Sequence, residues 1–347
     1  MSDRNQARRT AAEVRFDGTD ITKSILPYLL SITYTDNEED ETDDLQIKLQ
    51  DRDGIWTESW LQDIISASAS GFPIGAVLKR QNWNNDGGDQ TLDTGEFELD
   101  AVDSSGPPAT VTIKGTSLPY AAQIRQTKRS QAWEAYNLSG IANEMAGRNG
   151  MTCMYESASD PYYQRVEQYK VSDIAFLSQM CHDAGISLKA TNKTLVLFDQ
   201  ASYEKKAAVK AIQKGDGSYT RYKLGTGKAD VLYGSCRVSY TDPVTKSVIE
   251  GTATDEDGGD QCLEISAKVS SQGEAQALAA KRLRLHNKFS RSASFTMPLD
   301  LSLVAGVNIE LSGWGGWDGK YTVKQAKHTV GSPSTTQVEL RKILEGY

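Results

Sequence analysis

The sequence has few of the residues from which catalytic and metal centres are usually built. Its 347 residues include only four cysteines and three histidines. The cysteines form no CxxC pair and no cluster with histidine, which argues against a zinc site. So few cysteines in so long a chain also argue against a disulfide framework. We therefore expect free thiols, buried or half-buried, in a reducing cytoplasm.

The motifs of common nucleotide-binding and hydrolytic sites are missing as well. No GxGxxG, GxxxxGK[ST], HExxH or GxSxG occurs in the chain. A glycosidase needs only two carboxylates, and no pattern singles out a pair among the 46 acidic residues. These absences lower the expectation of an enzyme without removing it. We predict no catalytic residue, no bound metal and no cofactor.

Long apolar runs are also absent. Apolar residues make up 38% of the chain and the mean hydropathy is −0.49. No run of about 18 apolar residues could form a transmembrane helix. The N-terminal residues carry charge but no apolar segment follows them, so no secretory signal is expected. The sequence thus predicts a polar, soluble protein with no membrane anchor.

The chain lacks an excess of basic residues. Its formal net charge is −8 and its pI is about 5.1. A dedicated nucleic-acid binder would need a basic face, so that class is disfavoured. The charge still permits a surface past which nucleic acid slides, because an acidic wall repels phosphate.

What the sequence does contain is a succession of β, α+β and β patterns. In residues 1–115 short alternating segments such as Leu45–Leu49 predict half-buried strands, and glycine- and proline-rich turns separate them. Several short strands with regular turns favour a barrel or a sandwich. Residues 203–347 begin with a linker and return to strands. One helix interrupts these strands. Ser271 and Glu274 are spaced as its capping box, and its expected buried stripe consists of Ala275, Leu278, Ala279 and Leu285.

Residues 116–202 predict a small α+β domain. Its best-defined unit is Val171–Phe198, where Ser172 stands at the N-cap of an amphipathic helix and Gly185 at its C-cap. A turn at Asn192-Lys193 then joins two strands of a hairpin. An earlier helix is expected to begin after Asn137, which can serve as its N-cap. We therefore predict three domains, over 1–115, 116–202 and 203–347.

The main candidate site is an acidic run between two predicted strands. The simplest interpretation is a solvated loop. The functional interpretation is an acidic surface that faces a channel or a partner. A metal site is disfavoured because the EF-hand spacing is absent, although Asp255–Asp260 resembles half a calcium loop. The acidic residues in question are Glu38, Glu39, Asp40, Glu41, Asp43 and Asp44.

Other residues that could carry chemistry have simpler interpretations. Cys181 and His182 are neighbours on the predicted helix and point about 100° apart, so they cannot form a nucleophile pair. His182 is expected to interact with the helix dipole. Trp56 and Trp60 are spaced as one apolar face of a short helix. Trp314 and its neighbours lie in a glycine-containing turn, so we expect their side chains to be exposed and to contact a partner.

Read in order, several segments resemble the phage late control gene D family, the baseplate hub proteins of contractile tails, which are related to the base of the type VI secretion spike. The resemblance rests on the order and spacing of the segments rather than on a single motif. It runs through LQIKLQDRDGIWTESW (45–60), FPIGAVL (72–78), TGEFELDAVDSSGPPATVTI (94–113), AWEAYNLSGIANEMAGRNGM (132–151), the helix–hairpin unit, DGKYTV (318–323), His328 and Thr336–Leu340.

The resemblance implies a structural protein rather than an enzyme. Such hubs form homotrimers in which two tail-tube-like β-barrel domains flank a small α+β domain. The trimer joins the sixfold tail tube protein to the threefold spike protein, contacts other baseplate proteins, and forms a channel through which DNA passes without specific binding. The implied location is the virion, after assembly in the host bacterial cytoplasm. A tail-associated peptidoglycan-degrading enzyme and a hub of a bacteriocin-like particle remain as alternatives.

Overall fold

The chain is mainly β, as the sequence predicts. The computed structural model describes residues 7–39, 41–60, 72–83, 89–118, 122–226, 232–243, 245–255 and 258–343. The strands of the N-terminal region are β1 (Arg9–Phe16), β2 (Thr19–Asp20), β3 (Leu29–Asn37), β4 (Asp44–Gln50), β5 (Pro73–Gln81), β6 (Gln90–Ser105) and β7 (Thr110–Thr116). Two short helical segments accompany them, α1 (Thr22–Ile25) and the π-helical turn η1 (Trp56–Trp60).

The middle and C-terminal regions add the remaining elements. The middle region holds α3 (Gln123–Gln126), β8 (Lys128–Asn137), α4 (Leu138–Arg148), β9 (Thr152–Glu156), β10 (Tyr162–Ser172), α5 (Asp173–Ala184), β11 (Ser187–Thr191), β12 (Thr194–Phe198) and α6 (Gln200–Glu204). The C-terminal region holds β13 (Ala208–Gln213), β14 (Arg221–Thr226), β15 (Ser235–Thr241), β16 (Val248–Thr254), β17 (Cys262–Ser266), α7 (Gln272–Asn287), β18 (Arg291–Pro298), β19 (Asn308–Ser312), η3 (Gly315–Trp317), β20 (Gly319–Val330) and β21 (Thr335–Lys342).

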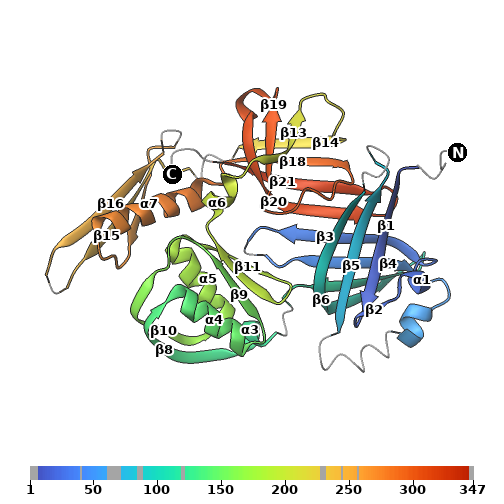
Figure 1. Ribbon diagram of the computed structural model, residues 1–347, viewed down its shortest axis with the longest axis horizontal. Coiled ribbons are helices and arrows are strands. Elements are labelled where there is room, and N and C mark those ends of the chain that lie inside the picture. Colours follow the sequence, from blue (N-terminus) through green and yellow to red (C-terminus); the bar gives the residue numbers. More distant parts are fainter. Residues whose placement is uncertain are drawn as a thin grey trace.

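One thirteen-stranded sheet joins the two β regions of the chain (Figure 1). Its main path runs β14-β18-β21-β20-β3-β4-β7-β6-β5-β1-β2, and β13 and β19 branch from β20. The seam is the antiparallel pair of β3 and β20, in which Ile32 lies opposite Val330 and Asn37 opposite Gln325. Strands almost 300 residues apart in sequence are therefore neighbours.

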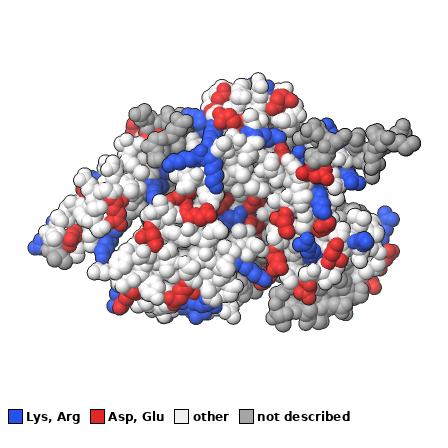
Figure 2. Space-filling model, viewed as in Figure 1, with Lys and Arg blue, Asp and Glu red and all other residues white. Residues whose placement is uncertain are grey.

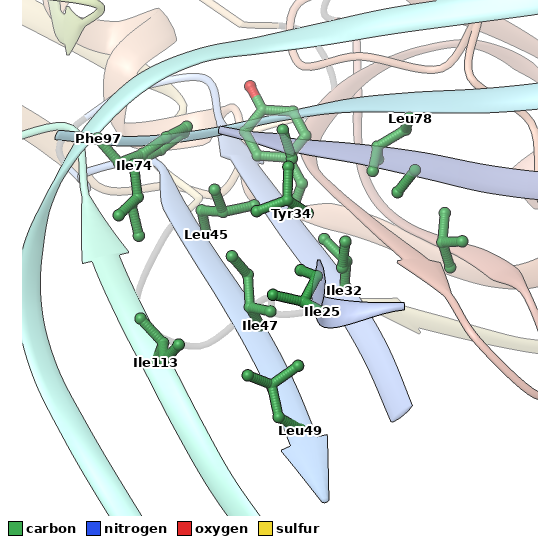
Figure 3. Packing of buried hydrophobic residues seen from close by; sticks show 14 of the residues in the cluster. Ile25, Ile32, Tyr34, Leu45, Ile47, Leu49, Ile74, Leu78, Phe97 and Ile113 are labelled. Atoms are coloured by element: carbon green, nitrogen blue, oxygen red, sulfur yellow. The ribbon is translucent and has the colours of Figure 1, made fainter. Parts of the chain in front are cut away.

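The first core lies between the two sides of the curled N-terminal part of this sheet. Alternating residues of β3 and β4, such as Ile32 and Ile47, point inward toward Ile74, Leu78 and their neighbours on the facing strands (Figure 3). Leu299 and Leu301 from the C-terminal region complete this core. The alternation along β4 is the pattern that its sequence predicts.

The middle region has a core of its own. Helices α4 and α5 pack with α3, the two-stranded ribbon β8–β10 and the three-stranded sheet β11-β12-β9. The predicted helix–hairpin unit is confirmed. The Ser172 hydroxyl accepts a hydrogen bond from the Ala175 backbone at 3.4 Å, Gly185 is left-handed with φ +66°, and β11 and β12 meet at Asn192-Lys193.

The cap of α4 differs from the predicted one. Asn137 occupies the N-cap position, but its side chain accepts no hydrogen bond from the helix. Instead Asp160, from the loop before β10, accepts from the Ser139 backbone at 3.0 Å and from the Asn137 side chain at 3.1 Å. The cap therefore comes from a residue more than twenty positions away, which the local sequence pattern does not reveal.

The C-terminal region contains two cores rather than one. Strands β18 to β21 pack around Phe295, Trp314 and Tyr321. Helix α7 instead lies on a separate sheet, β16-β15-β17, which extends to the left in Figure 1. The predicted buried stripe of α7 is corrected in part: Ala275 and Ala279 are buried, while Leu283 takes the place expected for Leu285.

Gly251 allows α7 to lie close to its sheet. A Cβ atom on this β16 residue would come within 2.2 Å of the Gln276 nitrogen and 2.3 Å of the Ala275 carbonyl carbon. Both distances are far below van der Waals contact, so a side chain here would push the helix away. The helix and its small sheet form a unit that the sequence patterns did not separate from the second β region. The three domain boundaries stay a prediction.

Candidate functional site: a buried polar junction

The acidic run enters the interior of the molecule at the end of β3. The Glu38 carboxylate receives two hydrogen bonds from the Arg341 guanidinium of β21, at 2.9 and 2.6 Å. Both side chains are about 2% exposed. Two parallel N–H···O bonds fix the orientation of both groups, as is usual for arginine–carboxylate pairs. The pair connects the start of the acidic run to β21, the most C-terminal of the described strands.

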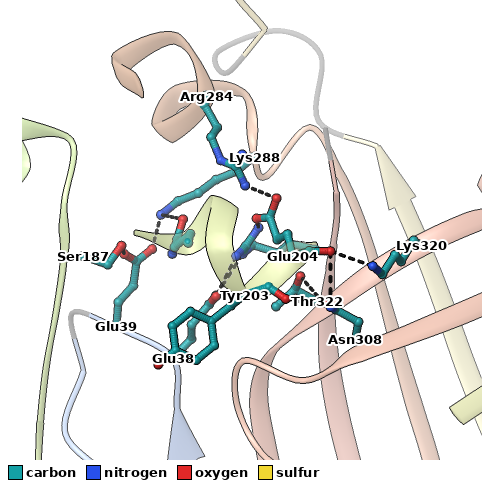
Figure 4. A network of polar contacts seen from close by, with 12 residues as sticks. Glu38, Glu39, Ser187, Tyr203, Glu204, Arg284, Lys288, Asn308, Lys320 and Thr322 are labelled. Carbon is teal, nitrogen blue, oxygen red and sulfur yellow. Dashed lines mark hydrogen bonds and ion pairs between the residues drawn. The ribbon is translucent and has the colours of Figure 1, made fainter. Parts of the chain in front are cut away.

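Arg341 also links this pair to two helices (Figure 4). Its remaining nitrogen donates to Glu204 of α6 at 2.5 Å, and the other oxygen of Glu204 contacts Arg284 of α7. The four charges alternate in sign through the buried network, so each carboxylate has a cationic partner. The junction thus joins β3, β21, α6 and α7.

Glu39 makes the next connection. Its carboxylate contacts the Lys288 ammonium just after α7 and accepts a hydrogen bond at 2.5 Å from the Ser187 hydroxyl of β11. Burial alone would raise the pKa of Glu39, but Lys288 and the Ser187 hydroxyl outweigh burial and hold the pKa below its ordinary value. Glu39 is therefore ionised at neutral pH and ties the middle region to α7.

The C-terminal end of α6 is held by side chains from the sheet. The Asn308 amide donates to the carbonyl oxygens of Tyr203 and Lys206, both at 2.9 Å, and Lys320 donates to the Glu204 carbonyl at 2.6 Å. The Thr322 hydroxyl donates to the Asn308 side-chain oxygen at 2.9 Å, which fixes the amide in place. Carbonyls that a helix end leaves unpaired are satisfied in this way.

A second buried cluster lies beside the junction. Lys189 of β11 contacts Asp36 at 2.5 Å and Asp43 at 3.3 Å. Burial raises the pKa of Asp43 to about 6; Lys189 opposes this rise and Asp36 adds to it. Burial alone would lower the pKa of Lys189, but the two carboxylates outweigh it and raise that pKa. One ammonium thus neutralises two carboxylates that are close together.

These contacts correct the expected exposure of the acidic run. Glu38, Glu39 and Asp43 are buried ion-pair partners within the chain, so they contribute to neither a solvated loop nor a channel surface. Their partners lie about 150 to 300 residues away in sequence. Glu41 is exposed and Asp44 is half-buried, and for these two the surface role stays a prediction. Asp40 lies outside the described residues.

Asp173 is a structural residue whose partners the sequence did not reveal. It is 1% exposed and contacts Arg148 of α4, with further hydrogen bonds from Asn149 at 2.9 Å and Gln168 at 2.8 Å. Burial alone would raise the pKa of Asp173, but these donors hold it below its ordinary value. The residue therefore links α4, α5 and β10, and it also lies in the first turn of α5, near the positive end of that helix.

The histidine, tryptophan and cysteine residues considered as candidate functional residues have structural surroundings. His182 lies near the end of α5, as predicted, and its ring nitrogen and carbonyl oxygen both contact Arg282 of α7 at 2.7 Å. Trp314 is buried in the C-terminal core instead of exposed in its turn, and Trp56 is buried in the N-terminal core. The side chain of Trp60 lies outside the described residues. All four cysteines are free thiols, and Cys262 is exposed, contrary to expectation.

The described residues meet few of the requirements of a metal site or of a ligand cavity. No group of three or more His, Cys, Asp or Glu side chains in the described part of the chain could hold a metal ion. Of the half calcium loop, Asp255 accepts a hydrogen bond from Asn287, and Glu256 and Asp257 lie outside the described residues. A cavity of roughly 200 Å³ lies between α5 and α7, and Glu39 and Lys288 on its wall are already paired with each other.

The described helices also indicate no membrane span. Within the described segments, the helices are too short or too polar to span a bilayer.

The surface around the junction is unevenly charged. Figure 2 shows basic side chains gathered where α6 and the C-terminal end of α7 meet the sheet, with acidic side chains directly below them. The site thus consists of paired charges that fix the regions of the chain to one another.

The fold as a whole is that of solved phage tail proteins. A tail protein from Neisseria meningitidis MC58 matches with a TM-score of 0.68 at 10% identity, over 96% of each chain. The 43 kDa tail protein of prophage MuSo2 from Shewanella oneidensis matches with a TM-score of 0.66 at 13% identity, over 95% of this chain and 97% of that one. The E. coli c3393 protein, described as a component of the type VI secretion system, gives 0.54 at 10% identity, over 97% of this chain and 77% of that one.

Sequence relatives define the class more narrowly. Proteins named "Probable baseplate hub protein" from Escherichia phages 186 and P2 are 28% and 30% identical to this chain, over 175 and 172 residues. Each alignment covers 49% of this chain and only about two fifths of the relative's own length, 41% and 40%. No protein-family model matches the sequence. Over about half of its length the chain is therefore similar to phage baseplate hub proteins, its fold is similar to that of tail proteins, and the predicted resemblance is confirmed.

Proposed function

We propose that this chain is the structural hub of a contractile-tail baseplate, in a phage or a related particle. In this proposal three copies form a ring between the sixfold tail tube and the threefold spike, and DNA passes through the ring without specific binding. Each copy contributes two tube-like barrel domains, one on either side of the middle region. The hub belongs to the virion and carries no catalytic activity.

The observation that carries the proposal is the name shared by the two sequence relatives, baseplate hub, together with a tail-protein fold that extends over nearly the whole chain. The continuous sheet supports it, because one chain presents two β regions side by side. The buried junction supports it as well. A component that transmits force between a tube and a spike needs its parts held rigidly, and the charge network of Glu38, Glu204 and Arg341 does this.

Two measurements test the proposal. The mass of the purified protein, alone and mixed with the tube and spike proteins of the same genome, is expected to be that of a trimer in at least one mixture. Electron microscopy of particles that carry a labelled copy should place the label on the tail axis, between tube and spike. A monomer in every mixture, or a label away from the axis, contradicts the proposal. Clearing of purified peptidoglycan by the protein alone would indicate the enzyme alternative instead.

A further inference from the structure

A row of polar residues crosses the large sheet, and all of its members except the buried Thr116 are exposed or half-buried. The pairing registers place one residue from each of eight neighbouring strands in this row. None of the eight is apolar, whereas in six of the eight strands a residue next to them belongs to a core, such as Phe295 in β18 and Leu45 in β4. We call these residues the outward row: Arg221, Thr296, Gln337, Lys327, Thr35, Asp44, Thr116 and Glu98, from β14 to β6.

Charge changes sign along the outward row. Arg221 and Lys327 lie on its C-terminal side, and Asp44 and Glu98 lie on its N-terminal side. The same polarity runs through the two β regions. Residues 1–115 contain 22 acidic and 10 basic residues, whereas residues 203–231 and 281–347 together contain 8 acidic and 17 basic ones. The net charge of −8 is therefore divided unevenly between these two parts of the sequence.

The basic end is an open strand edge. In the described part of the chain, β14 pairs with β18 alone, so its other edge presents free backbone groups. Arg221 and Lys223 are exposed and form no ion pair with any described residue. Between them, Tyr222 is 52% exposed while its ring packs edge-on against Trp314, with centroids 4.7 Å apart. An aromatic side chain held in place beside free charges is typical of an interface anchor.

The acidic end lies on β4 and β6, which flank β7 in the sheet, and on the loop before β4. Glu41, Asp44, Glu98 and Asp100 are exposed or half-buried there, and none forms an ion pair with a described residue. Burial and the charges of Asp100 and Glu41 raise the pKa of Asp44, and they outweigh the hydrogen bond from Thr116 and the charge of Arg125, which lower it. These carboxylates thus repel one another in the single chain, and a cationic partner would relieve that repulsion.

We infer that two copies of this chain meet head to tail, with the β14 edge of one copy docked against the acidic β4–β6 surface of the next. This inference rests on the proposed hub function and names the contact that its ring would use. The partner is a second copy because a single chain carries both complementary surfaces at opposite ends of one row. A contact between two different patches is heterologous, and it closes into a ring when the rotation permits. Opposite charges bring the ends together and exclude the reversed orientation.

A charge-exchange experiment tests the inference. The variants are R221E/K223E, which reverses the basic end; E98K/D100K, which reverses the acidic end; and a chain with all four changes. Sedimentation velocity gives the mass of each, and thermal unfolding verifies that each is folded. Each two-residue variant should raise the dissociation constant of the trimer roughly tenfold or more, since like charges then face each other. The four-residue variant restores opposite charges and should assemble again. K23E/K268E, which reverses two exposed lysines outside the outward row, should assemble like the unaltered chain.

The outcomes separate the inference from the function on which it rests. If neither charge reversal changes the dissociation constant of the trimer, the inference is wrong, but the proposed hub function is not affected. Failure of the four-residue variant to assemble, while folded, also overturns it. An unaltered chain that stays monomeric with tube and spike proteins refutes both. A short duplex DNA that binds the unaltered chain but not R221E/K223E, with no change in trimer mass, would assign the basic edge to nucleic acid and overturn the contact between copies.

Discussion

Arg341 and Glu38 are 303 positions apart in the chain and form a bidentate ion pair in its interior. Glu38 follows the first strand of the seam in the large sheet, and Arg341 lies on the last strand of the chain. The pair therefore connects the N-terminal and C-terminal regions beside the β3–β20 seam. Its surroundings exclude water, so the energy of each group depends on the presence of the other.

Replacing Arg341 with methionine should destabilise the fold strongly. Glu38 would keep its burial and lose the only cation that it contacts among the described residues. Breaking a buried pair on one side costs about 3–5 kcal/mol, and denaturant titration should show a loss of that size. The double variant E38Q/R341M removes both charges and should lose less than R341M alone. The exposed pair of Arg165 and Glu167 supplies the control, since E167Q should leave the free energy of unfolding nearly unchanged. Equal losses in R341M and E167Q would contradict the burial argument.

Adding one methyl group at Gly251 should loosen α7 from its sheet. The new Cβ would overlap the backbone of Ala275 and Gln276, and such overpacking costs about 1–3 kcal/mol or more. Hydrogen exchange should then increase in α7 and β15–β17 of G251A, with the N-terminal core unchanged. Gly147 is the matched control. It lies exposed in α4, and a Cβ added there would meet no atom within 4 Å, so G147A should stabilise by about 0.5–1 kcal/mol. Normal exchange in G251A would show that the helix can shift without cost.

Asp43 should make stability fall as the pH rises from about 4 to about 6. Its pKa in the folded chain is raised to about 6, above the ordinary value of 3.8. The folded state therefore binds the proton more tightly, and this contribution is complete below pH 4 and lost as the pH passes 6. Asn at this position keeps an oxygen acceptor for the Asn37 backbone and cannot titrate. Relative to the natural chain, D43N should gain stability between pH 4 and pH 6, as measured by denaturant titration at each pH. A difference that is constant with pH would contradict the predicted shift.

The two candidate caps of α4 can be compared directly. Asp160 accepts hydrogen bonds from the Ser139 backbone and hydroxyl, whereas Asn137 accepts none from the helix. D160A should therefore destabilise the chain by about 1 kcal/mol, as the loss of an N-cap does. N137A should cost less, because it removes only a hydrogen bond donated to Asp160. Thermal unfolding of both variants decides the order, and a larger loss for N137A would restore the local cap predicted from sequence.

Patterns within about thirty residues predicted the structure well. The ends of helix α5 and the hairpin turn depend only on atoms close in sequence. The predicted N-cap Ser172, the predicted C-cap Gly185 and the predicted Asn192-Lys193 turn are all present in the structure. The buried alternation of β4 followed in the same way from its own residues. The resemblance to baseplate hub proteins could also be recognised from the sequence, because it depends on the order of such local segments.

Long-range pairings could not be predicted from one sequence. The run that begins at Glu38 and Glu39 appears as a solvated loop, since acidic residues next to one another usually face water. Their cations, Arg341 and Lys288, come from the far end of the chain, and nothing near Glu38 indicates them. The same holds for α7. Its capping box was visible, but the close approach to Gly251 depends on how the helix lies across its sheet.

The seam between β3 and β20 has a consequence during synthesis. Asn37 leaves the ribosome 288 residues ahead of Gln325, its partner across the seam. At about 5–20 residues per second, β3 waits on the order of 15–60 s with one side of its backbone uncovered. An uncovered edge can pair with the same strand of another nascent chain. Production of the protein in cells should therefore benefit from chaperones that shield nascent chains, and a shorter delay between the two strands, as in a circular permutant, should reduce aggregation.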